Sequence, residues 1–152
     1  MVGGGVVGAV VVSTGEEDPT RQDKVADRGA VVMPFDLSAT SHVFNSSDDG
    51  GIQTVVADDP TDREQIALIR SHLREEVQRF GIGDFGDPEA IHGHEMPGLR
   101  VLAANADALA ISYRDVSDGG EVTYSSDDPA VVAALHDWFA AQLSDHGSHA
   151  HA

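Results

Sequence analysis

Two stretches of the chain carry apolar side chains at the spacing of an amphipathic helix. In residues 60–80 these side chains recur every three or four positions and form one stripe: Ile66, Ile69, Leu73, Val77 and Phe80. In residues 129–146 the corresponding side chains lie near one face: Val131, Leu135, Trp138, Phe139 and Gln142. Gly81 and Gly147 follow these stretches and are typical of helix C-termini. The pattern predicts two helices, each with one face turned to a core.

A predicted β-hairpin precedes each helix. Strands are expected at residues 42–45 and 52–57 before the first helix, and at 109–114 and 121–125 before the second. An Asp-Gly-Gly sequence separates the strands of each pair, and we expect its glycines to supply the positive φ of a tight turn. An Asp-Asp-Pro sequence then opens each helix, with aspartate as N-cap and proline as the first helical residue.

The two halves repeat at a spacing of 69 residues. Seven identical residues align without a gap: Asp49, Gly50, Gly51, Thr54, Asp58, Asp59 and Pro60 with Asp118, Gly119, Gly120, Thr123, Asp127, Asp128 and Pro129. Two ββα units, at about residues 42–80 and 108–146, would bury their apolar sides together. The sequence therefore predicts an α+β fold, in which a duplicated ββα unit gives a four-stranded antiparallel sheet with two helices on one face.

Both ends of the chain are expected to lie outside this single domain of residues 30–146. Residues 1–29 are interpreted as a flexible segment, in which an apolar, glycine-rich stretch is followed by a polar linker. The stretch is too short to span a membrane and is interpreted as the remnant of a signal or anchor. This favours an exported or membrane-tethered protein. Residues 147–152 are expected to form a histidine-rich tail.

The charge balance excludes two classes of partner. Nine basic residues against 26 acidic ones give a formal net charge of −17. Nucleic-acid binding needs clustered Lys and Arg, and an anionic membrane surface would repel such a chain. We therefore expect no nucleic acid and no direct binding to an anionic membrane surface. The absence of cysteine also excludes disulfides and thiolate ligands.

Histidine is the residue type that points most directly to chemistry. The chain has eight histidines, and imidazole binds Zn, Cu and Ni, whereas the thioether of methionine selects Cu(I). Two of the histidines lie in a connector, residues 83–105, which is longer than connectors in compact domains usually are and includes a short helix expected from Pro97. The candidate ligands of a copper or zinc ion are therefore these: His42, His72, His92, His94, Met96 and His146.

Simpler interpretations of the same residues remain open. His72 lies on the flank of the first apolar stripe, where a histidine is commonly satisfied by a nearby carboxylate or backbone group. Glu75 and Glu76 fit a solvated helix face, and Asp87 fits a turn in a loop. A site that combines His42, His72, His92 and His146 would require the connector to fold across the edge of the sheet.

Several short motifs resemble those of a family of short bacterial proteins, common in actinobacteria. The motifs include Val32-Met33-Pro34-Phe35-Asp36-Leu37, His42-Val43-Phe44, Ile69-Arg70-Ser71-His72-Leu73, Ile91-His92-Gly93, Met96-Pro97-Gly98-Leu99 and Ser144-Asp145-His146-Gly147. The resemblance covers nearly everything after residue 30 and includes every candidate ligand except His94. The family is often labelled aspartate carbamoyltransferase, so the resemblance implies a transferase that uses carbamoyl phosphate and aspartate.

Three hypotheses follow. The first is a small acidic accessory domain that binds copper or zinc through its histidines. The second is a module that binds a non-metal ligand or a protein, with structural histidines. The third is the carbamoyltransferase that the resemblance implies.

Overall fold

The computed structural model describes residues 19–152 as an α+β fold with five helices and five strands. The helices are α1 (Arg21–Val32), α2 (Arg63–Gly81), α3 (Gly86–His92), α4 (Leu99–Ala104) and α5 (Pro129–His146). The strands are β1 (Thr40–Ser47), β2 (Gly50–Ala57), β3 (Ala110–Val116), β4 (Gly119–Ser125) and β5 (Ala150–His151). Single 3-10 turns precede β1, β3 and β5.

The strands form one mixed sheet in the order β3-β4-β2-β1-β5. The hairpins β1–β2 and β3–β4 are antiparallel, and β2 pairs with β4 in the antiparallel sense. The expected four-stranded antiparallel sheet is thus extended by β5, which pairs with β1 in parallel. This strand arises because Gly147, with φ of 56°, ends α5 and turns the chain back to the sheet edge. The histidine-rich end is therefore part of the sheet.

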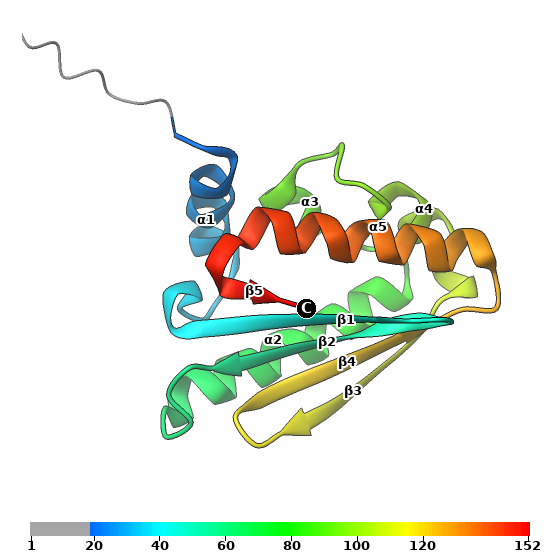
Figure 1. Ribbon diagram of the computed structural model, residues 1–152. Helices are drawn as coiled ribbons and strands as arrows, with labels where there is room; N and C mark the ends of the chain where they lie inside the picture. Colours follow the sequence, from blue (N-terminus) through cyan, green and yellow to red (C-terminus); the bar gives the residue numbers. More distant parts are fainter. Residues whose placement is uncertain (1–18) are drawn as a thin grey trace, which may run out of the picture.

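Helices α2 and α5 cover the same face of the sheet (Figure 1). Inward side chains alternate along the central strands, with Phe44 on β1 and Tyr124 on β4 fully buried. The rings of Trp138 and Phe139 on α5 meet Tyr124 edge-on. At the other end of β4, a Cβ at Gly120 would lie 2.9 Å from Leu73 of α2. The core lies between this helical layer and the sheet.

The hairpin glycines have a different role from the one expected. None of them has a positive φ, and Gly50 and Gly119 are the first residues of β2 and β4. A Cβ at Gly50 would lie 1.9 Å from the carbonyl oxygen of Tyr124, and one at Gly119 would lie 1.9 Å from that of Val55. Glycine is therefore required because the two central strands approach closely, not because the turn needs it.

Only one of the two expected helix starts is correct. Asp128 caps α5 by accepting from the amide of Ala130, and Pro129 is the first helical residue. Helix α2 begins later, because Asp59 caps a turn through the amide of Thr61 and Asp62 becomes the N-cap. The same Asp-Asp-Pro sequence thus gives two different local structures.

Helix α1 and the connector helices close one end of the molecule. Most of helix α1 lies within residues 1–29, which were interpreted as a flexible segment. The helix packs against α3 and α5. In Figure 1 it stands beside the C-terminal end of α5. The expected signal or anchor remnant, residues 1–14, lies outside the described residues. Among residues 19–152, no helix combines the length and apolar character required to cross a membrane.

Candidate functional site

A narrow cavity of about 40 Å³ lies beneath the sheet, between α2, α3 and α5. Its side chains with polar atoms come from six elements: His42 of β1, Gln53 of β2, His72 and Glu76 of α2, His92 of α3, Tyr124 of β4, and Trp138, Gln142 and His146 of α5. His42 points inward because it shares the strand face of Phe44, two residues away. The connector helix α3 brings His92 to the same cavity as His42 of β1, so four of the six predicted ligands line one cavity.

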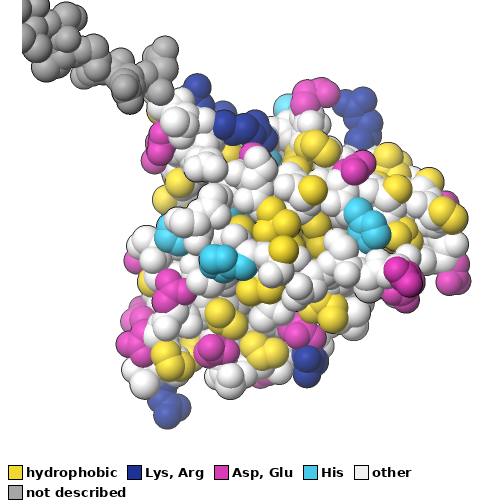
Figure 2. Space-filling view, viewed as in Figure 1, with side chains coloured by type: hydrophobic (Ala, Val, Ile, Leu, Met, Phe, Trp, Pro, Cys, Tyr) yellow, Lys and Arg dark blue, Asp and Glu magenta, His cyan; other side chains and the backbone are white. Residues whose placement is uncertain are grey.

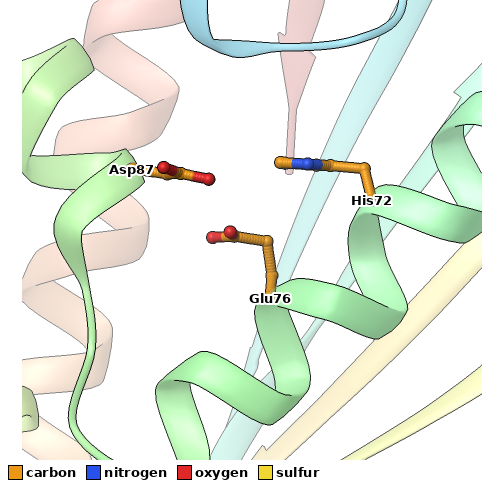
Figure 3. A group of neighbouring side chains, drawn as sticks. All are labelled: His72, Glu76 and Asp87. Carbon is orange, nitrogen blue, oxygen red and sulfur yellow. The ribbon is translucent and has the colours of Figure 1, made fainter.

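His72, Glu76 and Asp87 form the tightest group of potential metal ligands. Among residues 19–152, theirs is the one set of three whose ligand atoms all lie within 4.8 Å of one another. His72 and Glu76 are four residues apart on α2 and so project from the same helix face. Figure 3 shows both side chains directed toward Asp87, in the first turn of α3.

The Glu76 carboxyl group is unusually situated for an acid. It is 5% exposed, and its Oε1 atom has no hydrogen-bond partner. Burial, together with the hydrogen bond and the negative charge of Asp87, raises the pKa of Glu76 to about 9. Arg79 binds the Asp87 Oδ2 atom at 2.9 Å but remains 3.7 Å from Glu76 Oε1. One guanidinium therefore faces two carboxyl groups without fully neutralising them.

The remaining cavity histidines, His42, His92 and His146, lie beside this group and contact one another. The His42 and His146 rings stack with centroids 5.0 Å apart, and His146 meets His92 edge-on at 5.1 Å. Burial, followed by the charge of His146, lowers the pKa of His42 to about 3. Burial and His92 lower the pKa of His146 to about 4. Both imidazoles are thus neutral at pH 7, as an imidazole that binds a metal ion must be.

Asp145 and Arg21 hold His92 in one orientation. Burial would raise the pKa of Asp145, but hydrogen bonds from Arg21 and His92 outweigh it and lower that pKa. The His92 Nδ1–H group donates to the ionised Asp145 at 2.8 Å, and Arg21 donates to the same carboxylate at 2.6 and 2.8 Å. The Nε2 atom of His92 is then an acceptor.

A second cavity of about 230 Å³ shares two of these histidines. His42 and His146 form part of its wall, together with Asp145 and His149. The pair therefore lies between the buried cavity and a larger one near the C-terminal strand.

The other predicted ligands lie elsewhere. Met96 is 3% exposed but belongs to the hydrophobic core and does not line the cavity. His94 is exposed and lies beside Glu89, in a separate hollow. The adjacent pair His92 and His94 therefore does not converge, because Gly93, with φ of 95°, ends α3 between them.

Sequence reasoning missed the two carboxyl groups. Glu76 was assigned to a solvated helix face, whereas its neighbour Glu75 is the exposed one. Asp87 was assigned to a turn, whereas it opens α3. The four-residue spacing of His72 and Glu76 was a usable signal, because it places both side chains on the helix face that carries the core residues.

Acidic side chains form no single patch on the face shown in Figure 2. On that face, acidic side chains are scattered and histidines appear as separate spots. Comparisons with protein-family models, curated proteins and solved structures find no match to this chain.

Proposed function

We propose that this protein binds a divalent transition-metal ion, preferably zinc, through His72, Glu76 and Asp87. The observation that carries the proposal is the approach of their three ligand atoms to within 4.8 Å, with His72 and Glu76 in the cavity lining and Asp87 half-buried beside them. Zinc bonds to nitrogen and oxygen are about 2.0–2.2 Å long, which separates tetrahedral ligands by roughly 3.5 Å. Small side-chain rotations would close the group around an ion.

The donor set favours zinc over copper. One imidazole and two carboxylates are borderline-to-hard ligands, whereas Cu(I) selects thiolates and thioethers. Met96, the thioether among the predicted ligands, is packed in the core away from the group. His42, His92 and His146 line the same cavity and would surround the ion's open coordination position.

The charge of the group also suits a cation. Glu76 holds its proton at pH 7 because ionisation next to Asp87 in a buried site is unfavourable. A divalent ion would displace that proton and compensate both carboxylates. Of the described residues that line the cavity, none is Lys or Arg, so it offers no cation for carbamoyl phosphate. The transferase activity that the resemblance implies stays a prediction.

Metal analysis of untagged protein tests the proposal. We expect about one equivalent of zinc per chain, measured by mass spectrometry after dialysis in salt that screens the acidic surface. His72→Ala should weaken zinc binding at least about tenfold in a competition titration with a chelator. His94→Ala is the matched control, because His94 is exposed and outside the group. Equal loss in both variants, or no zinc in the parent, would favour the non-metal alternative.

We also infer that the two ββα units derive from one duplicated unit. Both hairpins have the same register, with Ser47 opposite Gly50 and Val116 opposite Gly119. The ladder between β2 and β4 pairs Gln53 with Val122, which are equivalent positions of the two units. A two-fold axis through this pair supports the duplication.

A further inference from the structure

The cavity contains more unsatisfied polar groups than a metal ion alone would occupy. Within residues 19–152, four buried side-chain atoms have no hydrogen-bond partner: His42 Nδ1, Glu76 Oε1, Trp138 Nε1 and Gln142 Nε2. All four residues line this cavity, and each is at most 6% exposed. Leaving a buried polar atom unpaired destabilises the folded state, because the atom loses its hydrogen bonds to water and gains none. Their convergence on one space indicates that something in that space binds them.

The chemistry of these atoms defines the missing partner. Metal binding would use Glu76, which leaves the other three. The indole nitrogen of Trp138 can only donate a hydrogen bond, and the amide nitrogen of Gln142 is also a donor. His42 is neutral and can donate from the unpaired Nδ1 position. The partner must therefore present acceptor atoms, which oxygen supplies.

Charge and size narrow the class further. A zinc ion with ionised Glu76 and Asp87 is formally neutral, and the bound Arg79 leaves a net charge of +1 for the assembly. This matches a monoanion, whereas the overall charge of −17 opposes anions of higher charge. A cavity of about 40 Å³ admits a molecule of roughly three to five non-hydrogen atoms. Phe80 and the ring of Trp138 supply apolar walls for a short carbon chain.

We propose that the cavity binds a small carboxylate monoanion, with one oxygen on the metal ion and the other accepting from Trp138 and Gln142. The proposal rests on the metal site proposed above and extends it to a ligand class. The metal ion supplies the only strong cation in the cavity, so carboxylate binding depends on it. The metal ion and the two N–H donors, Trp138 and Gln142, would fix both carboxylate oxygens at once, which a single water molecule cannot match.

The single tryptophan of the sequence is a direct reporter. Zinc content is measured first on the full-length, ¹⁵N-labelled protein, and the one indole N–H resonance is then followed while acetate is added at constant pH and ionic strength. We expect a saturable downfield shift of the indole proton in the zinc-loaded protein, and none in the zinc-free protein. Acetamide, a neutral molecule of the same shape, should bind at least about tenfold more weakly.

The variant Gln142→Leu tests the second donor without removing the reporter. It should weaken acetate binding about tenfold while zinc binding and spectral dispersion stay unchanged. Zinc binding without any acetate response would overturn the carboxylate proposal alone and assign the cavity to water. Equal acetate binding without zinc, equal binding of acetamide, or no effect of the variant would also overturn it. Failure to bind zinc would remove both proposals.

Discussion

Replacing Glu76 by glutamine should stabilise the metal-free protein while abolishing its response to zinc. The carboxyl group is buried beside Asp87, and its pKa is raised to about 9 from an ordinary value of 4.5. Glutamine imitates the protonated acid and can donate to Asp87 in the same way, but it does not ionise. The substitution therefore removes a group whose ionisation opposes folding, and with it a metal ligand.

The size of the effect follows from proton linkage. Between pH 4.5 and pH 9 the folded protein retains a proton that the unfolded chain has released. Stability therefore falls by about 1.4 kcal/mol for each pH unit in this window, and is greatest below it. At pH 7 the parent has lost roughly 3 kcal/mol that Glu76→Gln retains. This corresponds to a rise in Tm of roughly 10 °C, which should shrink to nothing near pH 4.5.

Thermal or urea unfolding at several pH values, with and without zinc, measures both effects. Zinc at a hundred times its Kd should stabilise the parent by about 2.7 kcal/mol and leave the variant unchanged. The control is Glu75→Gln, since that neighbouring side chain is exposed. The reasoning is refuted if Glu76→Gln is less stable than the parent at pH 7 with the same pH dependence, or if zinc stabilises both equally.

Four further outcomes are expected. Gly119→Ala should destabilise by at least about 2 kcal/mol in urea unfolding, because its Cβ would lie 1.9 Å from the Val55 carbonyl oxygen. Gly81→Ala, which meets nothing within 4 Å at the end of α2, should be neutral or slightly stabilising. Arg79→Ala should raise zinc affinity severalfold in the chelator titration, because it removes a competing cation from the carboxyl pair. Deleting residues 147–152 should increase amide exchange along β1, whose edge β5 covers.

The elements that could be predicted are those whose signal is local. The apolar stripe of α5 predicted a helix over residues 129–146, which is confirmed, and its five stripe residues are all buried. Helix α1 carries no such stripe, because only Val25 and Gly29 of its twelve residues are buried. It depends on packing against α3 and α5, which the sequence does not display. Strand β5 likewise exists because Gly147 returns the chain to β1.

The residues of the candidate site also fall into some that the sequence could predict and others that it could not. Histidine enrichment selected His72 and His92 as candidate ligands. It could not separate them from His94, which lies two residues after His92 and is exposed. That distinction depends on the end of α3 at Gly93. Glu76 was missed because a carboxylate on a helix is ordinarily solvated, and only the tertiary fold places α3 over it.

The proposed duplication offers a physical comparison between two carboxyl groups of the candidate site. Glu76 and Asp145 occupy equivalent positions, 69 residues apart, on α2 and α5, and both are buried carboxyl groups. Asp145 has Arg21 and His92 as partners, so its pKa is lowered and it remains ionised. Glu76 lacks a partner of that strength, so its pKa is raised and it retains a proton. Arg21 of α1 pairs with Asp145 only, and the proposed zinc site requires Glu76 to exchange its proton for the ion. Helix α1 thus keeps Asp145 ionised, whereas Glu76 is the carboxyl group whose proton the proposed metal ion would displace.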